Sequence, residues 1–367
     1  MRLVVFADLH LEAGFAWAGV EGQAARRRRD ALRETLRKIA DLTRDAGAGA
    51  LLCAGDLYEQ ERLASDTGPF LRKTFADLHP IPVFLAPGNH DWYGPESLYR
   101  RLEWSPNVHV FSTSQLTPAT LADGLTLWGA AHCLPAGTAG FLGSFAVDRG
   151  GVHLALFHGS EASGLPEQGD GKSPHAPFQA GDIERAGLHH AFVGHYHRPS
   201  DAAKHTYPGN PEPLAFGEDL ERGAVVVTVS PDGRVQRQRR RVAVTSVHDL
   251  GVDLSGCTSR QEARERVARM AAGRSGIARF TLEGALARAL DLVAHDLGDA
   301  APGLEAVVIR NGDIRIDYDL EAIAAEPTVR GQFVRDVSAA DLAADERRRV
   351  LLTGLRALDG RPNLEVP

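Results

Sequence analysis

The sequence predicts an α/β protein in which a large layered domain precedes a smaller α+β domain and a C-terminal helical tail. Three observations lead to this prediction. Short apolar runs alternate with helical stretches from the N-terminus to about residue 245. Polar segments with aspartate, histidine and glycine follow several of these runs. The pattern then changes, and only a short mixed segment and a final helix remain.

The large domain is predicted from its apolar runs. The strand candidates are Leu3–Ala7, Ala50–Ala54, Val83–Ala86, Leu125–Gly129, Val152–Phe157, Ala191–Val193 and Ala224–Val229. Between the first two strands, helical spacing aligns Leu32, Leu36, Ile39 and Thr43. The alternation of strands with helices favours a layered sheet protein.

The segment after residue 245 is predicted to be a small α+β unit. Gln261–Ala272 places apolar side chains on one helical stripe. The pair Asn311-Gly312 lies between Val307–Ile309 and an alternating run, which indicates a β-hairpin whose second strand contains Ile314, Ile316, Tyr318 and Leu320.

The last helix is predicted from a capping pair and an apolar stripe. Ser338 and Asp341 resemble an N-terminal capping pair, and Gly360 is a stop signal. The stripe between them contains Leu351, Leu355 and Leu358. We therefore predict boundaries at residues 1–243 for the large domain, 244–322 for the α+β domain and 323–367 for the tail.

Composition excludes several classes of protein. No apolar run approaches the length of a membrane span, so no membrane partner is expected. The N-terminus enters a strand without an export signal, which predicts a cytoplasmic protein. Three distant cysteines fit neither a disulfide framework nor a thiolate metal site. The net charge of -7 argues against coating nucleic acid by bulk electrostatics, so contact with DNA requires a local positive site.

Five short segments place potential metal ligands at the ends of strand-like runs. They are Asp8-Leu9-His10, Gly55-Asp56, Gly88-Asn89-His90-Asp91, His158-Gly159 and Gly194-His195-Tyr196-His197. Strand ends on one edge of a sheet meet at a common crevice, where α/β folds bind ligands. In extended geometry, the side chains of Asp8 and His10 are expected to point the same way. The same is expected of His195 and His197.

The donor types indicate a pair of divalent ions. Carboxylate, imidazole and amide ligands without thiolate favour harder ions, with manganese first and iron or zinc as alternatives. Two such ions suit hydrolysis of a phosphate ester. Asn89 is expected to be the ligand of its segment, which leaves His90 as a general acid that Asp91 orients.

The series of motifs resembles the calcineurin-like metallophosphoesterases. The resemblance implies a four-layer αββα sandwich for the first domain. It further implies that Asp8, His10, Asp56 and His197 bind one metal. Asp56, Asn89, His158 and His195 would bind the other, with Asp56 as the bridge.

A narrower resemblance lies in the segment Tyr207 to Glu218 and in Glu221-Arg222-Gly223-Ala224. It looks like the segment after the last metal histidine in SbcD-like exonucleases, the nuclease subunits of double-strand-break repair complexes. The resemblance implies DNA as substrate, 3'-5' exonuclease or endonuclease action, and a capping second domain. It also implies a homodimer and a coiled-coil SbcC-like ATPase partner, which would bind the helix of Leu351, Leu355 and Leu358. Packing of that helix on its own chain is an equal alternative.

One position departs from the family pattern. Glu59, three residues after the bridging aspartate, stands where relatives often have histidine or aspartate and where the side chain is associated with exonuclease action. Catalytic efficiency or polarity is therefore expected to differ.

A basic run near the domain junction has two interpretations. Arg237, Arg239 and Arg241 belong to this run and are candidates for contact with DNA phosphates. A plain charged strand is the alternative.

Two other functions compete with a DNA nuclease. A phosphatase or phosphodiesterase for small molecules would use the same metals. A non-catalytic adaptor subunit is hinted at only by Glu59, and the complete ligand set with His90 argues against it.

Overall fold

The computed structural model describes residues 1–13, 23–163, 174–218, 221–286, 292, 294–316 and 318–360. The chain divides into two compact units, Met1–Ser246 and Val247–Pro367. The predicted boundary followed residue 243, and the division follows Ser246. Each unit is described separately.

Unit 1 contains two six-stranded sheets. The first, in spatial order, is β12 (Val235–Arg240), β11 (Ala224–Val229), β1 (Arg2–Phe6), β2 (Ala50–Cys53), β3 (Val83–Leu85) and β4 (Val108–Val110). The second is β5 (Thr117–Ala122), β6 (Leu125–Gly129), β7 (Val152–His158), β8 (His190–Gly194), β10 (His205–Tyr207) and β9 (Ser200–Asp201). The strands from β1 to β4 are parallel, as are β6, β7, β8 and β10.

Strand alternation builds the layers of unit 1. On β1, Leu3 and Val5 lie in the core between the two sheets, while Val4 and Phe6 face the helices. The helical elements of the unit are α1 (Gln23–Asp45), η2 (Gln60–Arg62), α2 (Thr67–Ala76), α3 (Leu98–Arg101) and α4 (Ala180–Arg185).

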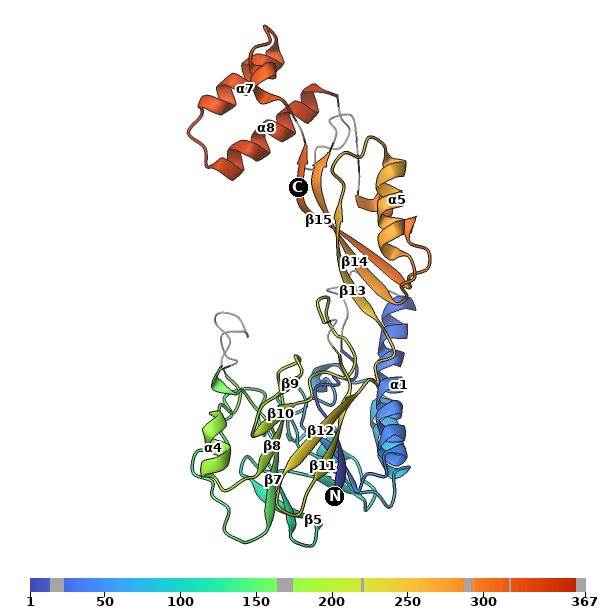
Figure 1. Cartoon of the computed structure of the whole chain (residues 1–367), viewed down its shortest axis with the longest axis vertical. Coiled ribbons are helices and arrows are strands. Elements are labelled where there is room, and N and C mark those ends of the chain that lie inside the picture. Colours follow the sequence, from blue (N-terminus) through green and yellow to red (C-terminus); the bar gives the residue numbers. More distant parts are fainter. Residues whose placement is uncertain are drawn as a thin grey trace. The chain divides into compact units, whose positions relative to one another are not determined.

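Helices cover both outer faces of the paired sheets. Leu36 of α1 packs on the first sheet, and Ile183 of α4 packs with Phe157 of β7 on the second. Figure 1 shows α1 and α4 on opposite sides of the strands. The predicted α/β class with an αββα sandwich is confirmed.

Unit 2 combines a three-stranded sheet with helices. The sheet has the order β13 (Val247–Asp253), β14 (Ile277–Leu286) and β15 (Ala306–Ile316). The helical elements are α5 (Arg260–Ala271), η4 (Ala294–Ala300), α6 (Leu320–Ala324), α7 (Val329–Ala339) and α8 (Ala344–Leu358). Ala263 and Val267 of α5 pack against Phe280 and Leu282 of β14, as the helical stripe predicted.

The predicted hairpin around Asn311-Gly312 is wrong. Both residues lie inside the continuous strand β15, which pairs in parallel with β14. A Cβ at Gly312 would lie 2.9 Å from the Leu282 carbonyl oxygen and 2.7 Å from Thr281 Cγ2. The glycine permits close approach of two strands rather than a turn.

The beginning of the last helix also differs from the prediction. Ser338 lies in α7, and α8 begins at Ala344 after Ala343. Leu351 and Leu355 are buried in a small core with Val334, whereas Leu358 is 46% exposed. Two leucines of the proposed partner-binding stripe therefore pack on their own chain.

Among the described residues, none of the helices combines the length and apolar character needed to cross a bilayer.

Candidate metal centre

The five sequence segments meet at the carboxyl ends of strands in unit 1. Asp8 and His10 follow β1, and Asp56 follows β2. Asn89 and His90 follow β3, His158 ends β7, and His195 and His197 follow β8. Parallel strands deliver their loops to the same edge of a sheet, so residues far apart in sequence converge there.

The ligand loops have left-handed backbone conformations. The φ angles are 54° at Asp8, 50° at His10, 51° at Asp56 and 111° at His195. The expected extended geometry of Asp8 and His10 is therefore wrong, and a turn aims their side chains. Such conformations cost about 1–3 kcal/mol each for a residue other than glycine. Backbone bonds hold the turn, from Asp8 N to Gly55 O at 2.9 Å and from His10 N to Asp56 O at 2.9 Å.

The ligand atoms form three overlapping clusters with mutual separations within 4.8 Å. One cluster contains Asp8, His10 and His197. The second contains Asp8, Asp56 and His158, and the third contains His10, Asp56 and His90. Asp8, His10 and Asp56 each belong to two of them, so the clusters share ligands, as neighbouring metal sites would.

Two predicted ligands lie beside these clusters. The Oδ1 atom of Asn89 is 3.0 Å from His158 Nε2. The His195 ring centroid lies 5.2 Å from that of His158, and its backbone N–H donates to Asp8 Oδ1 at 2.9 Å. The structure thus brings Asp8, His10, Asp56, Asn89, His158, His195 and His197 to one place.

The donor atoms fit cations. The Oδ2 atom of Asp8 is buried and has no hydrogen-bond partner among the described residues. The Nε2 atoms of His10 and His197 face each other at 3.1 Å. His158 donates from Nδ1 to the Ala54 carbonyl at 3.0 Å, and its Nε2 atom lies 3.2 Å from Asp56, where it could bind a metal once deprotonated. These residues would hold two divalent metal ions.

The charges of the centre are strongly coupled. Burial raises the pKa of Asp8. Burial also tends to raise the pKa of Asp56, but the positive charge of His158 beside it holds that pKa well below its usual range. Burial tends to lower the pKa of His158, and Asp56 nevertheless raises it to about 9. A carboxylate that attracts a proton this strongly also attracts a metal cation.

Glu59 links His90 to the ligand His10. Its Oε1 atom lies 2.7 Å from His10 Nδ1 and its Oε2 atom lies 3.0 Å from His90 Nδ1. Burial tends to lower the pKa of His90, but the hydrogen bond to Glu59 raises it to about 9. The His90 backbone N–H donates to Asp56 Oδ1 at 2.8 Å. The His90 imidazole is thereby fixed beside the candidate metal ligands.

The prediction that Asp91 orients His90 is wrong. Asp91 is fully buried, and its carboxylate accepts hydrogen bonds from the backbone of Asp56, Leu57 and Gly88 and from the Tyr99 hydroxyl. Within the described part of the chain, these hydrogen-bond partners do not include the His90 side chain. Asp91 holds the ligand loops together, and Glu59 orients His90.

Glu218 is a positioning residue that the sequence did not single out. Its Oε1 atom lies 3.4 Å from Nδ1 of the ligand His197. Its other oxygen accepts from Asn210 Nδ2 and Leu214 N, both at 2.6 Å. Metal-binding histidines commonly donate their second nitrogen to such a carboxylate. The feature of the sequence that could have pointed to Glu218 is its place at the end of the segment from Tyr207 to Glu218.

Two of the three candidate DNA-binding arginines donate hydrogen bonds to backbone carbonyls within unit 1. Arg237 donates to the Ala202 carbonyl at 2.6 Å, and Arg239 donates to the Pro208 carbonyl at 2.6 Å. Arg241 is exposed and lies 3.2 Å from the Ser246 hydroxyl. Arg237 and Arg239 therefore brace the loops after β9 and β10.

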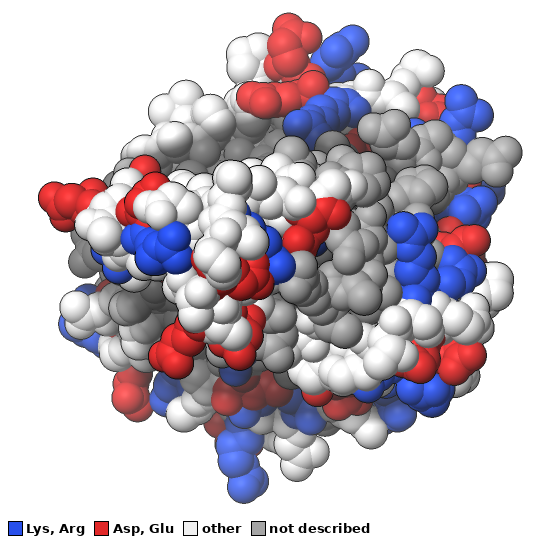
Figure 2. Space-filling model, turned by 90° about the horizontal axis from the view of Figure 1, so that it is seen from above, with Lys and Arg blue, Asp and Glu red and all other residues white. Residues whose placement is uncertain are grey.

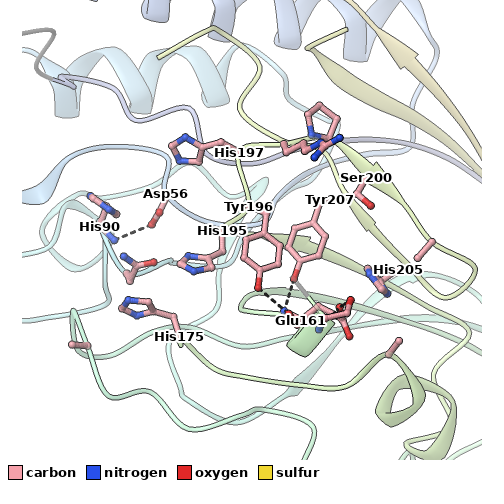
Figure 3. A pocket seen from close by; sticks show the side chains of 17 residues that line it. Asp56, His90, Glu161, His175, His195, Tyr196, His197, Ser200, His205 and Tyr207 are labelled. Carbon is pink, nitrogen blue, oxygen red and sulfur yellow. Dashed lines mark hydrogen bonds between the residues drawn. The ribbon is translucent and has the colours of Figure 1, made fainter. Parts of the chain in front are cut away.

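The centre opens into a pocket of about 1180 Å³ (Figure 3). Figure 3 shows His175 beside His195, with Tyr196 and Tyr207 farther along the wall. The lining residues include Asp56, Asn89, His90, Glu161, His175, His195, Tyr196, His197, Arg198, His205 and Tyr207. His175 was missed because it follows no strand-like run.

Comparison with known proteins shows which family this chain is similar to. The sequence profile of the calcineurin-like phosphoesterases matches residues 1–199 of this chain. The chain is 25% identical over 236 residues to an uncharacterized metallophosphoesterase, YhaO, of Bacillus subtilis (strain 168). That match covers 61% of this chain and 56% of the relative.

Two further proteins complete the comparison. The DNA double-strand break repair protein Mre11 of Methanopyrus kandleri is 25% identical over 358 residues, 87% of this chain and 70% of that protein. The crystal structure of TT1561 of Thermus thermophilus matches with a TM-score of 0.37 and 13% identity. It covers 65% of this chain and 98% of that one. The match of more than half the sequence to the family profile, with this ligand cluster, shows that the chain belongs to the calcineurin-like phosphoesterase family.

Proposed function

We propose that this phosphoesterase is a metal-dependent DNA nuclease that hydrolyses phosphodiester bonds as a 3'-5' exonuclease, an endonuclease or both. The observation that carries the proposal is the meeting of the predicted ligands with a His90 held by Glu59 at an open pocket. DNA as substrate is supported by the Mre11 relative, whose similarity extends over 87% of this chain. The Tyr207–Glu218 segment adds support through its resemblance to SbcD-like nucleases.

The chain's own residues suggest how the reaction proceeds. Divalent ions at such a site supply positive charge for the phosphate and lower the pKa of water. Asp8, His10, Asp56, Asn89, His158, His195 and His197 would hold them. His90 is 45% exposed and so can reach a substrate while Glu59 fixes its Nδ1 atom. Its Nε2–H is then the donor that delivers a proton to the leaving alkoxide.

The pocket's charge bears on how substrate binds. Among the described lining residues, Arg198 alone is an arginine or lysine, and Glu161 adds a negative charge. Such a wall offers few contacts to a run of phosphates, so affinity would come mainly from one phosphate at the metal centre. This arrangement suits removal of terminal nucleotides. It equally favours the alternative function, hydrolysis of a small-molecule phosphate diester.

A cleavage assay separates these functions. Linear DNA with a fluorophore at one 5' end is incubated with the protein and Mn²⁺, and the product ladder is compared for wild type, His90→Ala and Asp56→Ala. We expect shortening of labelled strands by the wild type and loss of at least about 100-fold in both variants, as for removal of a general acid. Turnover of small diesters with no cleavage of any DNA end would contradict the nuclease proposal and support the alternative.

Manganese, a homodimer and an SbcC-like ATPase partner also belong to this proposal. Metal analysis of the purified protein tests the first, and light scattering in solution tests the second. Co-purification with a coiled-coil ATPase tests the third. Because Leu351 and Leu355 are buried in unit 2, a partner on α8 would have to use its exposed side, where Val350 and Leu358 lie.

A further inference from the structure

His175 occupies the pocket wall without a role in the chemistry described so far. Its half-buried imidazole lines the pocket together with Asn89, His90 and His195. Its ring centroid lies 5.2 Å from that of His195 (Figure 3). A phosphate bound at the metal centre would therefore lie near this ring.

The backbone of His175 is fixed to the loop that carries the ligand His158. Its N–H donates to the Ser160 hydroxyl at 3.1 Å, and its carbonyl accepts from Ser160 N at 2.8 Å. A Cβ at Gly159 would lie 2.7 Å from the Ala176 carbonyl oxygen, so only glycine allows the two segments to pack this closely. His175 thus has a defined place relative to the metal centre.

The surroundings of His175 differ from those of the metal ligands. His10, His158 and His197 each pair Nδ1 with a carboxylate or carbonyl oxygen. Nδ1 of His175 is buried and has no hydrogen-bond partner among the described residues. His175 is also outside the three ligand clusters found in the described chain. It therefore lacks the second-nitrogen partner that usually orients a metal-binding histidine.

The same observation indicates which nitrogen carries the proton. A neutral imidazole has one N–H donor and one acceptor nitrogen. A proton on Nδ1 would be a buried donor without a partner, which is unfavourable. The proton is better placed on Nε2, so the ring offers a donor to the pocket.

We propose that His175 contacts the substrate by donating a hydrogen bond from Nε2 to a phosphate oxygen at the metal centre. This inference rests on the proposed hydrolysis of phosphate diesters but not on DNA as the substrate. His175 would then be a second histidine, after His90, that faces the substrate at the metal centre. His90 serves the leaving group, and His175 binds the phosphate.

The test compares His175→Phe, which keeps a ring without a donor, with His175→Gln, which keeps a donor. His109→Phe, at an exposed position on β4, is the matched control. Binding of inorganic phosphate to the manganese-loaded protein is measured by calorimetry, and manganese binding is measured separately. Hydrolysis of bis(p-nitrophenyl) phosphate gives kcat and KM.

We expect His175→Phe to weaken phosphate binding by about 10- to 100-fold, the range for a hydrogen bond to a charged group. KM for the diester should rise, His175→Gln should retain part of the affinity, and manganese binding should be unchanged. Phosphate affinity equal to wild type in His175→Phe would overturn the proposal, as would loss of manganese. If His175→Phe does not fold, the order His175→Gln above His175→Ala supports the proposal and equal affinities refute it.

Phosphate binding requires no turnover, so it tests His175 even when the diester is not hydrolysed. A wild type that binds phosphate but cleaves no diester contradicts the proposed function and leaves the His175 comparison valid.

Discussion

At the scale of single residues, one carboxylate contacts both a candidate metal ligand and the proposed proton donor. Glu59 lies between His10 and His90, and the hydrogen bonds from these histidines lower its own pKa to about 2 even though burial opposes this. It is thus ionised whenever the enzyme works near neutral pH. A negative charge at this place favours the protonated form of His90.

Glu59→Gln is expected to move the pH dependence of catalysis. A general acid must be protonated, so activity is lost as pH rises through the pKa of His90. The pKa of His90 is raised by Glu59, and removal of that charge lowers it, which shifts the alkaline limb of the kcat profile to lower pH. Glu61→Gln, at an exposed position on η2, is the control. An unchanged alkaline limb in Glu59→Gln would show that Glu59 does not set this pKa.

Asp56 is expected to connect metal binding to stability. Manganese that binds only the folded protein should stabilise it by about 2.7 kcal/mol at a concentration 100 times the dissociation constant. Asp56, like Asp8 and His10, belongs to two of the three ligand clusters, so Asp56→Ala should abolish most of this gain. Melting temperatures with and without Mn²⁺ measure the effect, with Asp77→Ala as the surface control. Addition of a chelator should likewise remove the gain from wild type, and an equal gain in Asp56→Ala would contradict a role of Asp56 in metal binding.

At the scale of elements, helix α1 shows how an amphipathic pattern becomes a layer. Its buried face contains Leu32, Leu36 and Ile39, which pack against Val4 and Phe6 of β1. The next residue after Leu36, Arg37, has a side chain that is 53% exposed. The helical period therefore separates residues that hold the sheet from residues that meet solvent.

Leu36→Ala should destabilise unit 1 by about 2–5 kcal/mol, because it removes a fully buried side chain and leaves a cavity. Arg37→Ala on the exposed face should change stability by less than about 0.5 kcal/mol. Urea denaturation followed by tryptophan fluorescence measures both. Equal midpoints for the two variants would mean that α1 does not pack on the sheet as described.

At the scale of the whole molecule, a buried ion pair joins distant parts of unit 1. Arg28 of α1 and Glu212 are both buried, with Nη1 and Oε1 3.0 Å apart. Glu212 also accepts from Thr35 Oγ1 at 3.0 Å and from the backbone N–H groups of Val244 and Thr245 at 2.7 and 3.1 Å. One carboxylate thus ties α1 to the end of unit 1.

Arg28→Ala should cost about 3–5 kcal/mol, because it leaves the Glu212 charge buried without its cationic partner. Arg101→Ala removes the exposed pair with Glu96, whose side chains are 62% and 83% exposed, and should cost less than about 1 kcal/mol. Denaturant midpoints again give the comparison. A small effect of Arg28→Ala would contradict the importance of this buried pair for stability.

Surface charge is the other property of the whole molecule. On the face drawn in Figure 2, lysine and arginine are interspersed with aspartate and glutamate among the described residues. The net charge of -7 agrees with this mixture. In the proposed nuclease, DNA affinity should therefore depend on local contacts at the metal centre and less on bulk attraction.

The sequence by itself determined the fold class and the identities of the candidate ligands. Strand periodicity and helical spacing are local properties, and donor types at strand ends are visible in the chain. Asp8, Asp56, Asn89 and His158 could be named from the sequence because each follows a strand-like run.

Tertiary structure decided which side chains face one another. Glu59 rather than Asp91 holds His90, Gly312 serves strand contact rather than a turn, and His175 reaches the pocket from a loop. Each of these three contacts depends on the distance between segments that are far apart in sequence. Local propensity does not encode such distances, because they are set by how the packed layers bring separate loops together.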